Sequence, residues 1–120
     1  MTMRKLADIA KTIRSKNAGV DKITFDIIFR TKEEYELVCR AGVITRATIG
    51  KLYGLRQDRI TDFEEFDPAF AIKFSILRDR PSGSPGDPDI FGAQQYAPLM
   101  DIKVPVYATG RVEHTGEVKW

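Results

Sequence analysis

Two short segments in which apolar and polar side chains alternate strictly constrain the fold most. They cover residues 22–30 and 70–76. A period of two is typical of β-strands that bury one face and leave the other polar. The side chains predicted to point inward are Ile23, Phe25, Ile27, Phe29, Phe70, Ile72, Phe74 and Ile76. Large apolar side chains in this number are enough to seed the core of one small domain.

The residues between these two segments predict helices. Thr31 and Glu34 have the spacing of a capping box, in which the Thr31 hydroxyl accepts from the Glu34 N–H and the Glu34 carboxylate accepts from the Thr31 N–H. The first helix is expected to end at Gly42, a residue type that readily adopts the left-handed conformation of a helix end. A second helical piece is expected over residues 45–54, which also end in glycine.

Residues 60–66 predict another strand, although three of them are acidic. Pro68 has no N–H to donate to a sheet, so we expect a turn at Asp67 and Pro68 before the second alternating segment. Residues 79–89 contain so many glycines and prolines that they predict an irregular loop. Residues 90–100 predict a helix and residues 102–107 a final strand.

The N-terminal region predicts a short amphipathic helix. Its apolar positions follow the i, i+3, i+4, i+7 spacing and are Leu6, Ile9, Ala10 and Ile13. We expect the helix to end within residues 14–19, where asparagine and glycine favour a stop.

The predicted order is therefore one helix followed by β-α-β-β-α-β. This order is typical of an α+β ferredoxin-like sandwich, in which two helices cover one face of an antiparallel sheet. We expect a single domain over residues 1–107 with the extra helix at its N-terminus. Residues 108–120 form a C-terminal extension, which we interpret as either a surface strand or an interface arm anchored by Trp120.

Composition excludes several function classes. A net charge of +2 on 120 residues, without a long basic run, argues against nucleic-acid binding. Cys39 and His114 are the only cysteine and histidine, so neither an intramolecular disulfide nor a Cys/His metal site is expected. We find no secretory signal, no apolar run that spans a bilayer and no cofactor motif. The sequence predicts a cytoplasmic protein without cofactor, metal or membrane.

Two segments are candidates for anion binding. In the first, loop hydroxyl and N–H groups form a nest for a carboxylate or phosphate, with arginines at its entrance; its candidate residues are Ser82, Gly83, Ser84, Gly86 and Asp87. The second contains Arg14, Ser15, Lys16 and Asn17. The alternatives are a solvated connection for the loop and simple helix capping for the basic segment.

Further candidates are polar side chains that orient or deprotonate a substrate. Gln94 and Gln95 are able to orient a carboxylate or amide, or else they are solvated. Asp26 and Asp67 are candidate general bases. Asp26 otherwise faces water or a partner, and Asp67 otherwise stabilises the turn before Pro68. Cys39 is interpreted as a small buried apolar residue rather than a nucleophile.

Four stretches carry a resemblance to a known family. They read KLADIAKTIRSKNAG, FDIIF, EFDPAFAIKFSI and SGSPGDPDIFGAQQYAPLMDI. Together they resemble the DUF4387 family from about residue 5 to residue 104, and residues 105–120 extend past its usual end. Members of this family are similar to the C-terminal ferredoxin-like domain of AtuA-type proteins of acyclic terpene and acyl-CoA catabolism.

The resemblance implies a small accessory subunit of a larger AtuA-like protein. Such a complex acts on an organic acid or an acyl-CoA in a lyase or hydratase step, so the ligand is a small carboxylate or a CoA thioester. The resemblance also groups the segment 14–17, Asp67 and the loop 82–87 into one anion site at a shared interface. The alternatives are a non-catalytic, homo-oligomeric interaction module and, last, a self-sufficient enzyme with Asp26 or Asp67 as base.

Overall fold

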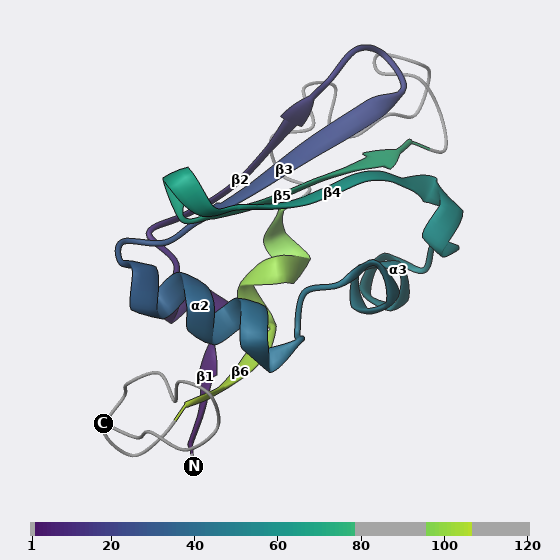
Figure 1. Cartoon of the computed structure of the whole chain (residues 1–120). Coiled ribbons are helices and arrows are strands. Elements are labelled where there is room, and N and C mark those ends of the chain that lie inside the picture. The colour runs from purple at the N-terminus through teal and green to yellow at the C-terminus, as the bar shows by residue number, and fades with distance from the viewer. Residues whose placement is uncertain (1, 79–95, 107–120) are drawn as a thin grey trace.

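The computed structural model describes residues 2–78 and 96–106, which form an α+β domain with two antiparallel sheets (Figure 1). The strands are β1 (Thr2–Lys5), β2 (Thr12–Asn17), β3 (Lys22–Ile28), β4 (Ile60–Phe66), β5 (Ala71–Leu77) and β6 (Lys103–Val106). The α-helices are α1 (Leu6–Ile9), α2 (Lys32–Ala41) and α3 (Arg46–Tyr53), and the 3-10 helices are η1 (Gln57–Arg59), η2 (Asp67–Ala69) and η3 (Ala97–Asp101).

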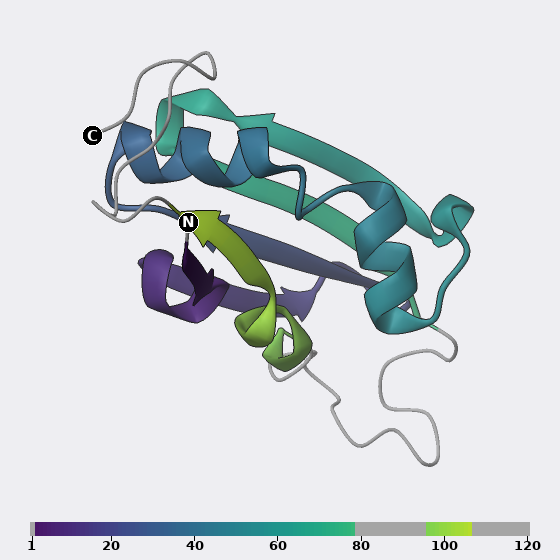
Figure 2. The ribbon, with the colours of Figure 1, turned by 90° about the horizontal axis from the view of Figure 1, so that it is seen from below.

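The larger sheet has four antiparallel strands in the order β2-β3-β5-β4. The alternation predicted for β3 and β5 is confirmed, because their inward side chains are buried while the polar ones point the other way. Phe25 of β3 lies opposite Phe74 of β5, and their rings stack with centroids 4.7 Å apart. The helices and the β1–β6 pair lie on this apolar face (Figure 2). In the described ranges, no helix or strand packs on the other face, which we call the outer face (Figure 1).

The helix ends largely follow the sequence. The Thr31 hydroxyl accepts from the Glu34 N–H, and Gly42 closes α2 with a φ of 67°. The reciprocal bond predicted for the Glu34 carboxylate does not form, and its Oε1 atom is buried without a partner among the described residues. A complete capping box occurs instead at Thr45 and Thr48, at the start of α3.

The prediction for the N-terminal segment was wrong in its second half. Only Leu6–Ile9 is helical, and Thr12–Asn17 is strand β2, paired over its whole length with β3. The apolar spacing detected buried positions correctly, since Leu6, Ile9 and Ala10 are buried. A helix of one turn has little stability of its own, whereas pairing with β3 along its whole length satisfies the backbone groups of β2 that face β3.

This change also alters the topology. The ferredoxin-like order is not confirmed, because it would place the final strand, β6, next to β3. In the structure β2 takes that position, and β6 pairs with β1 in a separate two-stranded sheet. The unit β3-helices-β4-β5 is as expected, with β5 between β3 and β4. A hairpin between neighbouring segments closes a much shorter loop than a pairing of β3 with β6, and short loops lose less entropy.

The C-terminal prediction is confirmed only in part. The described end of the expected helix, residues 97–101, is a 3-10 helix that contains Pro98, and β6 lies within the expected final strand. The loop 79–89, residues 90–95 and the tail 108–120 lie outside the described residues. None of the helices within the described ranges is long and apolar enough to cross a membrane.

Candidate functional site

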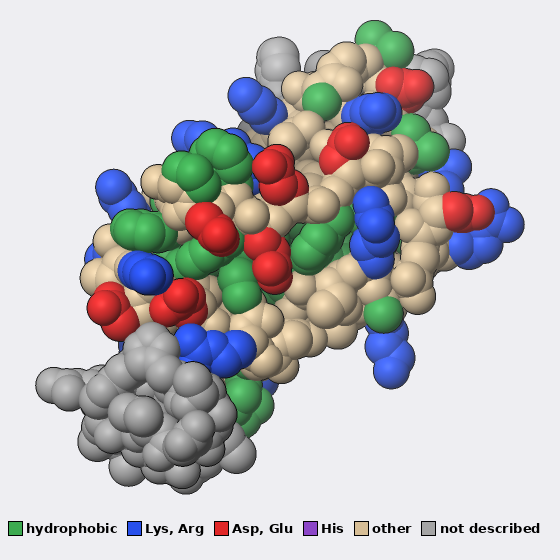
Figure 3. Space-filling model, in the orientation of Figure 1, with side chains coloured by type: hydrophobic (Ala, Val, Ile, Leu, Met, Phe, Trp, Pro, Cys, Tyr) green, Lys and Arg blue, Asp and Glu red, His purple; other side chains and the backbone are tan. Residues whose placement is uncertain are grey.

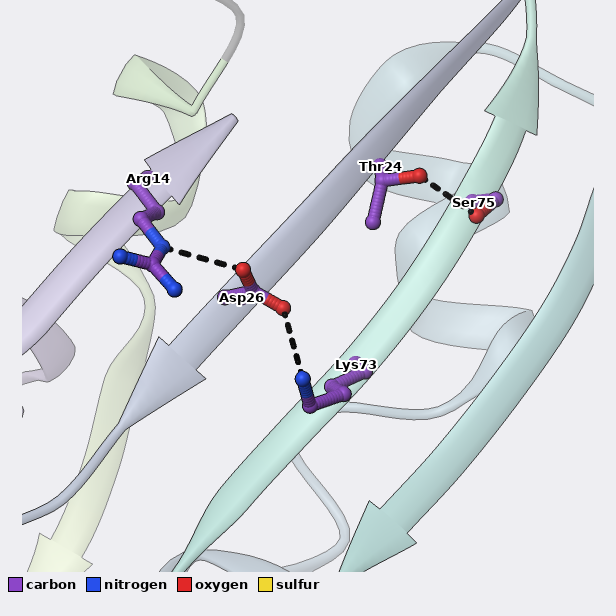
Figure 4. A network of polar contacts seen from close by, with 5 residues as sticks. All are labelled: Arg14, Thr24, Asp26, Lys73 and Ser75. Atoms are coloured by element: carbon purple, nitrogen blue, oxygen red, sulfur yellow. Dashed lines mark hydrogen bonds and ion pairs between the residues drawn. The ribbon is translucent and has the colours of Figure 1, made fainter. Parts of the chain in front are cut away.

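A row of charged side chains crosses the outer face of the four-stranded sheet (Figure 4). The register places Arg14 of β2, Asp26 of β3 and Lys73 of β5 side by side. Arg14 Nε donates to Asp26 Oδ2 at 3.0 Å, and Lys73 Nζ lies 3.6 Å from Asp26 Oδ1. In the next row the hydroxyls of Thr24 and Ser75 are hydrogen-bonded at 3.1 Å. We call these five residues the polar ladder.

The centre of the polar ladder is a buried carboxylate. The Asp26 side chain is 8% exposed, whereas its partners Arg14 and Lys73 are 59% and 42% exposed. Each of its two oxygens faces one cation, and little of the side chain is exposed to meet a substrate. Asp26 therefore lies on the face that the sequence indicates, but its surroundings suit an ion pair better than a general base.

The rest of the basic segment contacts both ends of the undescribed stretch 79–95. The Asn17 side-chain oxygen accepts from Arg78 Nη1 at 2.7 Å, just before this stretch. The Ser15 hydroxyl accepts from the backbone N–H of Tyr96 at 3.2 Å, just after it. Lys16 is exposed on the outer face, on the same side of β2 as Arg14. Strand β2 thus holds both flanks of the loop that the sequence associates with anion binding.

Seven of the predicted site residues lie outside the described residues. They are Ser82, Gly83, Ser84, Gly86, Asp87, Gln94 and Gln95.

Asp67 lies apart from the basic segment. It follows β4 at one end of the sheet. The register across this end runs from Phe66 to Ala71, Ile28 and Thr12. Asn17 lies at the other end of β2, so that it is about 17 Å along the strand from Thr12. Asp67 also belongs to the helix-covered side, where its Oδ1 accepts from the Tyr35 hydroxyl at 2.6 Å. The structure therefore does not bring Asp67 to the segment 14–17.

Asp67 borders a cavity of about 390 Å³ between α2 and the end of β4, which we call the corner pocket. Its lining residues are Lys32, Tyr35, Glu36, Cys39, Arg40, Glu65, Asp67 and Phe70. In Figure 3, acidic, basic and apolar side chains are mixed where α2 meets the sheet. The volume is within the range of small-molecule sites in proteins.

The Cys39 thiol and the Tyr35 phenol of the corner pocket are both neutral at pH 7. Burial, followed by the nearby Glu65 carboxylate, raises the pKa of the Cys39 thiol to about 12. Burial, followed by the hydrogen bond to Asp67, also raises the pKa of Tyr35 well above its ordinary value. Cys39 is half-buried and protonated at neutral pH, which agrees with its interpretation as an apolar residue rather than a nucleophile.

Sequence reasoning missed Tyr35, Lys32 and Lys73 as members of these sites. The alternation of β5 already placed Lys73 on the outer face, opposite Asp26 once the strands are paired. Tyr35 is a buried residue of α2, and nothing in the sequence links it to Asp67, 32 positions further on. Only the packing of α2 against the corner after β4 joins them.

The fold and the ladder define a small α+β domain in which, over residues 2–78 and 96–106, helices cover one face of the sheet and leave the charged outer face uncovered (Figure 1). The sequence matches the family model described as a domain of unknown function, DUF4387, over residues 6–103. The chain belongs to the DUF4387 family. Neither a curated protein nor a solved structure matches it.

Proposed function

We propose that this chain is a small accessory subunit of a two-component enzyme, bound through its outer face to a larger AtuA-like subunit. The complex would act on an organic acid or an acyl-CoA in a lyase or hydratase step. The family resemblance suggests the kind of partner, and the bare outer face with its polar ladder is the observation that carries the proposal. As far as the described ranges extend, this sheet face is polar, charged and free of covering helices, which is the composition of an interface rim rather than of a core (Figure 1).

The cations of the outer face support the proposal that this chain contributes to anion binding. Arg14 and Lys16 project from β2, the strand at the edge of the sheet, and Lys73 adds a third cation from β5, in the same row as Arg14. Asp26 compensates only part of this charge. An organic carboxylate or a CoA phosphate bound between the two subunits would meet charge-assisted donors on this side. The ladder also fixes the Arg14 guanidinium, so that less side-chain entropy is lost on binding.

The alternative, a homo-oligomeric interaction module, is supported by the charge pattern of the same face. The register continues the ladder row to Glu64 of β4, so that basic residues lie at the β2 side and acidic residues at the β4 side. Two copies stacked face to face about an axis along the strands would bring opposite charges together.

A purification with a charge-reversal variant tests the two readings. The tagged full chain is isolated from its native cell, and the proteins that co-elute in gel filtration are identified by mass spectrometry. We expect one larger AtuA-like protein in stoichiometric amount, its loss with Lys16→Glu, and its retention with Lys51→Glu, which changes an exposed lysine of α3. A chain that elutes alone contradicts the proposal, and a pure homo-oligomer supports the alternative.

The ligand is tested on the purified complex. Small dicarboxylates and CoA thioesters are titrated against complexes that contain the parent chain, Arg14→Ala or the control Lys51→Ala. Loss of one charge-assisted contact is expected to weaken binding about tenfold with Arg14→Ala only. Equal affinity for all three complexes would remove Arg14 from the site.

A further inference from the structure

The corner pocket combines a stripe of α2 with the corner that follows β4. Five of its residues are on α2 at the spacing i, i+3, i+4, i+7 and i+8, which places them on one side of the helix. Glu65, Asp67 and Phe70 close the pocket from the sheet side. This site is separate from the outer face, which lies on the opposite side of the sheet.

The charges of the pocket are arranged in two groups. Glu36 and Arg40 lie one helical turn apart and pair with each other at 3.8 Å. Lys32 forms no ion pair within the described residues, and it is one turn from Tyr35, whose hydroxyl binds Asp67. A cation and two carboxylates, Glu65 and Asp67, therefore border the same cavity. A simple anion would pair only with Lys32, and a simple cation would pair only with the two carboxylates.

The remaining walls are apolar and held in place. The rings of Tyr35 and Phe70 have centroids 6.3 Å apart. Phe70 has a φ of 51°, which is unusual for a bulky residue, and its backbone is fixed by bonds to Asp67 and Phe29. Strained backbone of this kind persists where the surrounding structure determines it, and it is enriched at ligand sites. The phenol of Tyr35 donates to Asp67 and so sets the direction of its carboxylate.

We infer that the corner pocket binds a zwitterion of the amino-acid class. The ligand ammonium group lies toward Glu65 and Asp67, its carboxylate toward Lys32, and its apolar side chain against Tyr35 and Phe70. Charge-assisted hydrogen bonds at both ends select a molecule that carries both charges. The volume of the cavity accommodates an amino acid with a medium-sized side chain.

The test uses the isolated full chain and does not depend on a partner subunit, so its outcome is independent of the accessory-subunit proposal. L-Leucine is titrated by calorimetry and by amide chemical shifts, in parallel with N-acetyl-L-leucine, which lacks the ammonium group, and L-leucinamide, which lacks the carboxylate. We expect binding of L-leucine with a Kd on the order of 1 mM or tighter, and at least about tenfold weaker binding of either derivative. The shifts should centre on Tyr35, Cys39 and Phe70.

Conservative variants assign the two ends of the ligand. Asp67→Asn should weaken the binding of L-leucine and make its affinity nearly equal to that of N-acetyl-L-leucine. Lys32→Gln should weaken it likewise and make the affinities of L-leucine and L-leucinamide nearly equal. Asp58→Asn and Lys51→Gln remove equivalent charges at exposed positions outside the pocket and should change nothing. Circular dichroism confirms that each variant is folded. No binding of L-leucine, equal binding of its blocked derivatives, or shifts located elsewhere would each overturn the proposal.

Discussion

The outer face and the corner pocket each hold one of the two carboxylates that the sequence marks as candidate bases. Asp26 lies in the middle of a sheet, 8% exposed, with a cation at each oxygen. Asp67 is exposed at the end of a strand, and one of its oxygens accepts from the neutral phenol of Tyr35. The two aspartates are alike in sequence terms, since each follows an apolar residue of a strand or its end.

The difference shows how surroundings decide what a carboxylate is able to do. Both oxygens of Asp26 already face cations within the fold, so its contribution is to hold β2, β3 and β5 in register and to position Arg14. Among the described residues Asp67 accepts from one neutral donor, and it borders a cavity, which leaves acceptor capacity for a ligand. The outer face is therefore suited to a broad protein contact, and the corner pocket to a small molecule.

The largest expected effect concerns the thiol of the corner pocket. The pKa of Cys39 is raised from 9.0 to about 12, so at pH 8 the folded chain holds about a thousandfold less thiolate than the unfolded chain. Iodoacetamide should alkylate the folded chain slower by about this factor. The rate should rise about tenfold per pH unit up to about pH 12, because the thiolate is the reacting form.

Two variants compare the regions in the same assay. Glu65→Gln removes a negative charge beside the thiol and should accelerate alkylation, whereas Asp26→Asn on the outer face should not. Equal acceleration by both variants would show that the two regions are not independent. The rates are measured by mass spectrometry of quenched samples.

The next effect is the loss of stability when the polar ladder is broken. Asp26→Ala leaves Arg14 and Lys73 without their shared partner, and we expect the free energy of unfolding to fall by about 2 kcal/mol. This value is below that of a fully buried pair because both cations are partly exposed. The matched change Asp62→Ala, at an exposed position of β4, should cost no more than about 0.5 kcal/mol. Urea denaturation that gives equal losses would contradict the role of the ladder.

The smallest effect concerns the hydrogen bond of the corner pocket. Tyr35→Phe keeps the ring packing and removes the donor to Asp67, with an expected loss of about 1 kcal/mol. A double-mutant cycle with Asp67→Ala, which removes the acceptor, isolates the pair from other effects. The double variant should lose little more stability than either single variant. Losses that add in full would show that the bond does not contribute to stability.

Local patterns predicted the elements of the domain well. The side-chain period predicted the alternation of β3 and β5 and the bounds of β4. Capping chemistry predicted that α2 begins after Thr31 and ends at Gly42. The prediction of a helix over β2 was wrong because its first residues share an apolar spacing with a real helical turn. The sequence indicated that Leu6 and Ile9 are buried, but not that the chain becomes extended three residues later.

Neither site was predictable to the same degree. The ladder needs the register of three strands, and the corner pocket needs α2 to pack beside Asp67, in contacts that join residues up to 51 positions apart. Position in the sequence determines which side chains share a face of a strand or helix, because that depends only on the local repeat. Which faces meet depends on long-range pairing and on the entropy of the loops that it closes. The sequence by itself therefore determined β3, β4 and β5, the ends of α2 and most of the apolar core, and only the tertiary structure decided that Asp26 is ion-paired and Asp67 borders a cavity.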